Sequence, residues 1–387
     1  MSVSISDADW QRLFEFCERQ GLVGVGFAAV EKLHTKGVAC PANLRMQWMA
    51  LALQIEKKNV LLNEQCKKLT EQYRHDGLAT CILKGQGNCL NYPEELRMRR
   101  MPGDIDLWAM PYEDISIAVQ TGKEDVKYIT CHGHRAVIEY VRMQFRLQGI
   151  DANPKACYHH IEAPTMDGTE VEVHYRPAFL RSPLRNWRMQ RWFENHADEC
   201  MKNRTYLGFS MMTSSVNVVY QMCHLYTHIF EGGIGLRQLM DYYFALRVWH
   251  NDVMECKDLQ SQGMWSEGMG TPVMSKEEVM AVLKSFGMGK FAAAVMYVLH
   301  KTFAMPTHYY ICKPNEKEGR KLLAEIMQGG NFGQYDTRDA ALKKGGMIKH
   351  GVWKLKRVMR LVSIYPEEAL WEPVFRVYHL LWRGING

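Results

Sequence analysis

The sequence predicts an α+β protein in which a small mixed β-sheet core is flanked by N-terminal and C-terminal helical regions. Two patterns favour this fold. Apolar residues recur at helical steps of three and four before residue 76 and after residue 180. Between these regions, short apolar segments end at glycine or proline, which is typical of strands. We therefore expect three consecutive regions, 1–76, 77–180 and 181–387, in a chain too long for one core.

The two outer regions are expected to be helical. In the first, Trp10, Leu13, Phe14 and Cys17 follow the spacing of one helical face. The last region keeps this periodicity from Pro177 almost to the end of the chain. The sequence thus predicts two helical regions of unequal size around the core.

The central region is expected to form a mixed sheet of at least four strands. The strands are predicted over 78–84, 104–110, 157–163 and 170–175. The Asp167-Gly168 pair between the last two is typical of a tight hairpin turn. Helices are predicted behind the second strand, over 112–121, and further on, over 135–147.

Composition favours a globular protein of the cytoplasm. Hydrophobic residues make up 47% of the chain and charged residues 23%, which argues against disordered and fibrous proteins. The first residues lack the features of a signal peptide, and we expect no membrane span because no apolar run approaches roughly 18 residues. The 11 cysteines, without a C-x-x-C pair, favour reduced thiols over a disulfide framework.

Asp104 and Asp106 are candidate metal ligands. Alternate residues of a strand face the same side, so these two carboxylates project together while Ile105 and Leu107 point into the core. Adjacent carboxylates repel each other unless a cation lies between them, and Mg²⁺ prefers oxygen ligands. The alternative interpretation is a pair of solvated aspartates at a strand edge.

Glu172 is the candidate third carboxylate. In the segment 170–175, Glu170, Glu172 and His174 alternate with apolar residues, which predicts one polar and one buried face. If this strand lies beside the Asp104–Asp106 strand, Glu172 completes a cluster able to hold two divalent ions. A solvent-facing strand edge is again the alternative.

The turn after the first predicted strand is a candidate phosphate-binding element. Gly85 and Gly87 allow the backbone to approach a ligand closely, and Lys84 can neutralise phosphate charge. The turn matches neither the Walker pattern nor a dinucleotide-binding fingerprint. On its own, the turn is better interpreted as a simple connection from strand to helix.

Taken together, these motifs resemble a known family. In order along the chain they are Leu83-Lys84-Gly85, Tyr92-Pro93, the arginines Arg97, Arg99 and Arg100, Asp104-Ile105-Asp106-Leu107, and Val171-Glu172-Val173-His174-Tyr175. This series looks like the uncharacterised nucleotidyltransferase family of the polymerase-beta-type nucleotidyltransferase superfamily. Segment 224–241 looks like the helical segment that follows the core in that family.

The resemblance implies a nucleotidyltransferase-like core over 77–180 that holds metal on Asp104, Asp106 and Glu172. It also implies that Lys84, Gly85 and Gly87 contact the phosphates of the nucleotide. Arg100, Arg237 and Asp241 are further candidates for binding the nucleotide. Arg237 and Asp241, four residues apart on one predicted helix, could instead pair with each other.

The predicted function is Mg²⁺-dependent transfer of a nucleoside monophosphate from an NTP to an acceptor hydroxyl, with release of pyrophosphate. Two Mg²⁺ ions are the expected cofactors, and the NTP is the co-substrate. The acceptor stays open among a small molecule, tRNA, a protein and a sugar. The alternative is a catalytically inactive binding or scaffold protein with the same fold, which the absence of a serine after Gly85 favours.

A basic stretch near the end of the chain suggests a third function. Residues 343–360 contain no acidic residue and seven basic ones, namely Lys343, Lys344, Lys349, Lys354, Lys356, Arg357 and Arg360. Interleaved apolar residues predict an amphipathic helix, which could bind RNA, anionic lipid or an acidic protein. The alternative is a helix that packs by its apolar face and leaves its basic face in water.

Several histidines have no assigned role. His224 and His228 share a predicted helical face and could bind zinc or simply pack. His132 and His134, and likewise the adjacent pair His159 and His160, lack a cysteine or acidic partner at ligand spacing.

Overall fold

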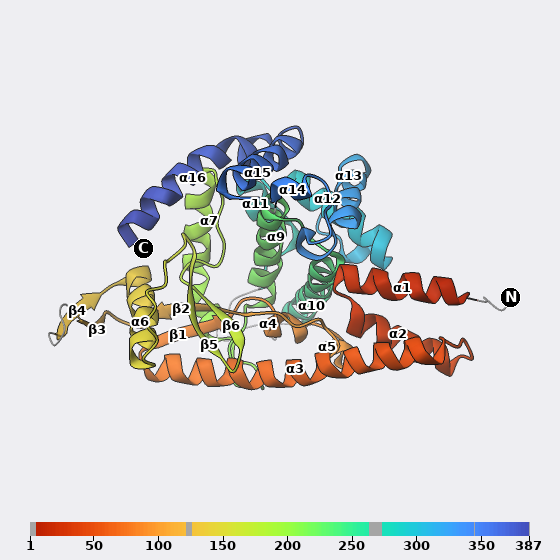
Figure 1. Cartoon of the computed structure of the whole chain (residues 1–387), viewed down its shortest axis with the longest axis horizontal. Coiled ribbons are helices and arrows are strands. Elements are labelled where there is room, and N and C mark those ends of the chain that lie inside the picture. Colours follow the sequence, from red (N-terminus) through yellow and green to blue (C-terminus); the bar gives the residue numbers. More distant parts are fainter. Residues whose placement is uncertain (1–4, 121–125, 263–272, 344, 387) are drawn as a thin grey trace. The chain divides into compact units, whose positions relative to one another are not determined.

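Residues 5–120, 126–262, 273–343 and 345–386 are described by the computed structural model (Figure 1). They divide into two compact units, each built from three segments. The helical unit comprises Met1–Leu61, Asn88–Pro102 and Gln221–Ala369. The sheet unit comprises Leu62–Gly87, Gly103–Tyr220 and Leu370–Gly387. The three consecutive regions expected from the sequence stay a prediction as domains.

The sheet unit contains the predicted mixed four-stranded sheet, in the order β1-β2-β6-β5. β2 pairs with β6 in parallel, whereas β1 pairs with β2, and β5 with β6, in antiparallel fashion. The strands are β1 (Leu78–Ile82), β2 (Ile105–Pro111), β5 (His160–Met166) and β6 (Thr169–His174). With helices on both sides of this sheet along the chain, the predicted α+β fold class is confirmed.

The turn between β5 and β6 is the predicted hairpin. Asp167 and Gly168 have φ values of 47° and 75°, so both lie in the left-handed region. A two-residue turn with both residues in this region matches the right-handed twist of the flanking strands. Asp tolerates this conformation better than most residues and Gly adopts it without a steric cost.

The helix predicted over 112–121 is wrong. The structure forms a second, two-stranded sheet there, in which β3 (Ile115–Gln120) pairs with β4 (Val126–Cys131). The physical reason lies in the spacing: Ile115, Ile117 and Val119 recur every second residue, and β-branched side chains favour strands. The partner strand β4 was not predicted, so the sequence offered no pairing that would have favoured a strand over a helix here.

The predicted helix over 135–147 is confirmed as α6 (Gly133–Leu147), which packs against β2 and β5 of the sheet unit. Its Ala136, Val137 and Val141 are fully buried. Its Tyr140 meets Tyr73 edge to face, with ring centroids 4.9 Å apart. Burying an aromatic side chain in this way contributes about 2–3 kcal/mol, so α6 anchors the sheet in the core.

Several helices contribute residues to the sheet unit, and some of them also contribute to the helical unit. They are α3 (Ala42–His75), α4 (Gln86–Cys89), α7 (Pro183–Asn195), α8 (Ala197–Lys202), α9 (Ser214–Glu231) and α16 (Pro366–Asn386). From α7, Phe193 contacts the buried Trp108 of β2, with centroids 6.3 Å apart. From α16, Phe375 stacks on Phe179 at 5.1 Å.

The helical unit holds the remaining helices. They are α1 (Asp7–Gln20), α2 (Val23–Thr35), α5 (Glu94–Arg97), α10 (Leu236–Ser261), α11 (Lys276–Ser285), α12 (Gly289–Phe303), α13 (Glu316–Gly329), α14 (Ala340–Lys343), α15 (Met347–Val362) and the short helices η2 (Thr307–Tyr309) and η3 (Asn331–Gly333). Trp48 is central near the N-terminus: it is fully buried, contacts Phe14 and donates to the Val23 carbonyl at 2.7 Å. Across the described ranges, none of the helices combines the length and apolar character needed to cross a membrane.

Candidate active site

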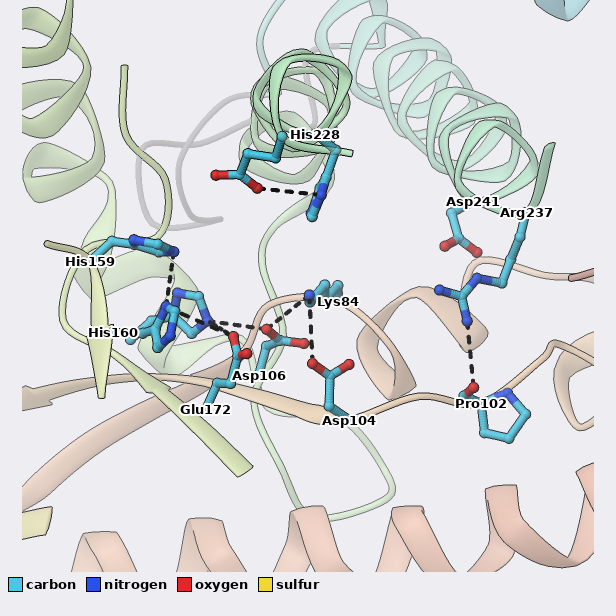
Figure 2. Close-up of polar contacts among 12 residues, drawn as sticks. Lys84, Pro102, Asp104, Asp106, His159, His160, Glu172, His228, Arg237 and Asp241 are labelled. Atoms are coloured by element: carbon cyan, nitrogen blue, oxygen red, sulfur yellow. Dashed lines mark hydrogen bonds and ion pairs between the residues drawn. The ribbon is translucent and has the colours of Figure 1, made fainter. Parts of the chain in front are cut away.

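The parallel pairing of β2 and β6 brings Asp106 and Glu172 together. Asp106 lies directly beside Glu172 in the register, and Trp108 lies beside His174. Asp104 immediately precedes β2, two residues before Asp106. Figure 2 shows the three carboxylates gathered on one side of these strands, together with Lys84. The structure therefore places Glu172 beside the aspartate strand, the arrangement in which it was predicted to complete the cluster.

The turn after β1 places Lys84 between the two aspartates. Leu83 N–H donates to the Asp106 carbonyl at 3.0 Å, which ties the turn to β2. Lys84 Nζ then lies 3.0 Å from Asp106 Oδ1 and 4.0 Å from Asp104 Oδ2. In this arrangement the ammonium group takes the position of a cation between the two carboxylates.

Both glycines of this turn have local reasons for their identity. Gly85 has a φ of 58°, a left-handed conformation that strains other residues. At Gly87, an added Cβ would lie 3.0 Å from the Ile82 carbonyl oxygen, so a larger residue would require the backbone to shift by a few tenths of an ångström. Both residues shape the turn that carries Lys84, and their contacts with a nucleotide stay a prediction.

Asp106 provides a test of whether the cluster suits a metal ion. Its side chain is fully buried, and Oδ1 accepts from His174 Nε2 at 3.1 Å and from Lys84. Its second oxygen, Oδ2, is buried and accepts no hydrogen bond within the described part of the chain. Buried polar atoms are normally satisfied, so this oxygen lacks the partner that a bound cation would supply.

Asp106 belongs to a group of three potential ligands. One ligand atom each from Asp106, Glu172 and His174 lie within 4.8 Å of one another. Asp104 is outside this group, but Lys84 links it to Asp106. The residues present therefore fit a divalent ion, with carboxylate oxygens as the main ligands.

The charged groups of this cluster shift one another's pKa values. Repulsion from Asp106, together with burial, raises the pKa of Asp104 above its usual value. Burial would also raise the pKa of Asp106, but Lys84 and His174 outweigh it and hold that pKa below its usual range. Conversely, burial disfavours the charged form of Lys84, whereas Asp106 and Asp104 raise the pKa of this lysine.

His174 completes the cluster, and no role was predicted for it. Its Nε2 lies 3.4 Å from Glu172 Oε2 as well as 3.1 Å from Asp106. Burial lowers the pKa of His174, but the hydrogen bonds to Asp106 and Glu172 raise it to about 9. The sequence did carry a signal, because His174 alternates with Glu172 and so shares its face of the strand.

His159 and His160 also reach this region, although the sequence left them unassigned. His160 is the antiparallel cross-strand partner of His174, and its Nδ1 lies 3.9 Å from Glu172 Oε2. The two rings of His159 and His160 contact each other through a 2.9 Å nitrogen–nitrogen hydrogen bond. Their partners come from β6, which local spacing in the sequence could not reveal.

A family model that describes an uncharacterised nucleotidyltransferase matches residues 6–263. The chain belongs to this nucleotidyltransferase family. The match includes the whole four-stranded sheet and all the residues gathered around Asp106. Neither the curated proteins nor the solved structures include a significant match to the chain. The resemblance expected from the motifs is thereby confirmed.

The other three nucleotide-binding candidates of this family member lie in the helical unit. Arg100 donates to both carboxylate oxygens of Asp241, at 2.7 and 2.8 Å. Asp241 also accepts from the Tyr92 hydroxyl at 2.7 Å. Arg237 donates to the carbonyls of Met101 and Pro102 at 3.3 and 3.4 Å. These contacts form a buried polar network, and a role in nucleotide binding stays a prediction for all three residues.

His224 and His228 share one face of α9, with ring centroids 4.3 Å apart. His228 Nδ1 lies 3.6 Å from Glu231 Oε2. Within the described residues these three do not form one of the groups whose ligand atoms converge within 4.8 Å. The zinc interpretation therefore gains no support from the geometry.

The basic stretch 343–360 lies beyond the residues that the family model matches. Most of it forms α15, which buries Trp353, Val358 and Leu361. Arg357 is buried as well and donates to the Ile229 carbonyl at 2.6 Å. Lys356 pairs with Asp339 at 2.8 Å. Part of the basic charge is thus used within the protein; Lys344 lies outside the described residues, and binding of an anionic partner stays a prediction.

Proposed function

We propose that the protein transfers a nucleoside monophosphate from an NTP to an acceptor hydroxyl group and releases pyrophosphate. The observation that carries this proposal is the convergence of Asp106 and Glu172 on adjacent parallel strands, with Asp104 two residues ahead and Lys84 between the aspartates. Membership of the nucleotidyltransferase family supports the reaction class. The base of the NTP and the acceptor are left open.

Asp104, Asp106 and Glu172 would hold two Mg²⁺ ions. Magnesium, when bound, supplies positive charge that activates the attacking oxygen and stabilises the charge developing on the phosphates. The unpartnered Oδ2 of Asp106 is the best single ligand atom, because it is already buried and oriented by its neighbours. Asp104 is about one-third exposed and adds a carboxylate that can turn toward solvent and the incoming nucleotide.

In the proposed reaction, the acceptor oxygen bonds to the α-phosphorus of the NTP, and the bond from that phosphorus to pyrophosphate breaks. The acceptor proton must leave as this bond forms. His174 is a poor proton acceptor at neutral pH, because its raised pKa of about 9 keeps the ring protonated. Glu172 is the remaining candidate, because its carboxylate lies beside Asp106 at the site. Burial would raise its pKa, but the hydrogen bond from His174 lowers it.

Lys84 has two roles in this proposal. Without a nucleotide it neutralises Asp106, which would otherwise be a buried charge with only His174 as a partner. With a nucleotide bound, its flexible side chain can turn from the aspartates to the triphosphate, which would leave the carboxylates available to hold a divalent ion. The loss of either aspartate should therefore harm the reaction more than the loss of Lys84.

The position of Lys84 also supports a second candidate function. A lysine that stays between Asp104 and Asp106 would keep divalent ions out, and the protein would then bind a partner without turnover. Absence of a serine after Gly85 favours the same interpretation. The two candidates differ in one measurable property, which is Mg²⁺-dependent binding of an NTP.

The proposed function is tested by incubating the purified full chain with each of the four NTPs, Mg²⁺ and a cell extract. Mass spectrometry then identifies any molecule that gains a nucleoside monophosphate. The matched control carries Asp104→Asn and Asp106→Asn, which remove the two charges but keep the side-chain shape. A product formed by the native chain and absent from the control supports transfer. Products formed equally by both proteins would overturn the site assignment.

A further inference from the structure

A cluster of three imidazole rings lies beside the carboxylates. One ligand nitrogen each from His159, His160 and His174 lie within 4.8 Å of one another. The ring centroids of these residues are 4.4 to 5.4 Å apart. Figure 2 shows His159 and His160 next to Glu172 and the aspartates. The proposed transfer reaction assigns no role to His159 and His160.

We propose that His159, His160 and His174 bind a first-row transition metal ion of the zinc type, next to the carboxylate site. Imidazole nitrogen is a ligand that suits zinc and related metals, whereas Mg²⁺ prefers oxygen. Metal–nitrogen bonds of roughly 2.0–2.1 Å in a tetrahedral site place ligand atoms about 3.3 Å apart. The three ligand nitrogens, which lie within 4.8 Å of one another, would move closer together to reach this spacing.

Independent evidence for a missing partner comes from His174. Its Nδ1 is buried and forms no hydrogen bond with any described residue. The whole residue is 4% exposed, so water does not readily replace the missing partner. A metal ion bound to this nitrogen would supply the missing partner, because buried polar atoms are normally satisfied. In metal-binding histidines, one ring nitrogen binds the metal and the other forms a hydrogen bond.

The surroundings of the other two rings are compatible with metal binding. Burial, together with the neighbouring rings His160 and His174, keeps the pKa of His159 well below its usual value. Burial and His174 lower the pKa of His160 to about 4. Each ring binds a metal in its neutral form, so His174 releases its Nδ1 proton to the solvent as the ion binds.

Glu172 faces the other ring nitrogen of His174, away from the unpartnered Nδ1. Its Oε2 lies 3.4 Å from His174 Nε2 and 3.9 Å from His160 Nδ1. Glu172 thus stays with the proposed Mg²⁺ site, and its contact with Nε2 holds the His174 ring in place. The histidine site does not depend on the proposed reaction, since its ligands are intact whether or not transfer occurs.

The test begins with the full chain after removal of metals by a chelator. Co²⁺ is added as a coloured substitute for Zn²⁺, and visible absorption reports how many ligands surround it. We expect one tightly bound ion, and His159→Gln and His160→Gln should each weaken its binding at least about 100-fold. This figure follows because even the loss of a group that only supports a ligand costs 10–100-fold.

Two matched controls locate the site. His132→Gln removes an exposed histidine of the same unit, and His228→Gln removes one of the pair on α9. Neither should change Co²⁺ binding. Unchanged binding in His160→Gln, or lost binding in His228→Gln, would overturn the proposal. Thermal melting of each variant checks that it is folded.

X-ray absorption spectroscopy of the Zn²⁺-loaded native chain removes any dependence on variants. Three imidazole ligands around zinc support the proposal, and none or one contradicts it. Asp104→Asn separates this proposal from the proposed function. This variant should lose Mg²⁺-dependent NTP binding and keep Co²⁺ at the histidines, so either proposal can fail without the other.

Discussion

Lys84 Nζ lies 3.0 Å from the fully buried Asp106 Oδ1. The pair joins the turn after β1 to β2, one of the two inner strands of the sheet. Because Asp106 is removed from water, its charge depends on Lys84 and on the 3.1 Å hydrogen bond from His174. This relationship links the stability of the sheet unit to the chemistry proposed for its site.

Replacing Lys84 should destabilise the protein in a way that Mg²⁺ can reverse. Lys84→Met keeps most of the side-chain volume but leaves Asp106 without its ammonium partner. Breaking a buried ion pair typically costs about 3–5 kcal/mol, and His174 should reduce this loss. Denaturant unfolding with and without Mg²⁺ measures the effect. The variant should gain more stability from Mg²⁺ than the native chain does, and an equal gain in both proteins would contradict a cation position between the aspartates.

Removing an aspartate should abolish Mg²⁺-dependent NTP binding. Asp106→Asn removes the charge of the best-oriented ligand, and Asp104→Asn removes the charge of the more exposed one. Isothermal titration calorimetry of an NTP with Mg²⁺ should show no measurable binding in either variant. Glu170→Gln is the matched control, because it changes an exposed carboxylate of the same strand as Glu172. Normal binding in Asp106→Asn would remove the basis for the metal assignment.

The backbone of Gly85 offers a separate test of the turn. Its φ of 58° is left-handed, which costs other residues about 1–2 kcal/mol, although an added Cβ would meet only the Asp104 carbonyl at 3.4 Å. Gly85→Ala should therefore lower the free energy of unfolding by about 1 kcal/mol. Gly85→Asn should recover part of this loss, because asparagine tolerates the left-handed region. Equal losses in both variants would mean that steric contacts of the added side chain, and not backbone conformation, require glycine at this position.

Much of the sheet could be predicted from the sequence because its signals are local. Alternation at Asp104–Asp106 and at Glu170–His174 predicted the polar face, and the Asp167-Gly168 pair predicted the turn. The pairing of Asp106 with Glu172 was not predicted itself; the sequence predicted only that Glu172 would complete the cluster if the two strands were neighbours. The helix predicted over 112–121 was wrong because strand pairing with β4 decides that segment, and pairing is a long-range property.

The histidines show why the rest of the site could not be predicted. His160 meets His174 only through the antiparallel pairing of β5 with β6, and His159 joins them where the chain enters β5. Along the chain the adjacent pair has no cysteine or acidic partner at ligand spacing, so it was left unassigned. In the helical unit, likewise, helical spacing could not reveal that Arg100 is the partner of Asp241.

The Arg100–Asp241 pair allows a prediction that separates a structural role from nucleotide binding. Both side chains are about 95% buried and joined by two hydrogen bonds, so Asp241→Ala should destabilise the protein by about 3–5 kcal/mol by leaving Arg100 unpaired. The control is Asp198→Ala, which removes an exposed partner of Lys202 and should change stability by less than about 1 kcal/mol. Chemical denaturation measures both. If Asp241→Ala keeps its stability but loses NTP binding, Asp241 serves the nucleotide; if it loses stability, Asp241 mainly holds Arg100 in the core.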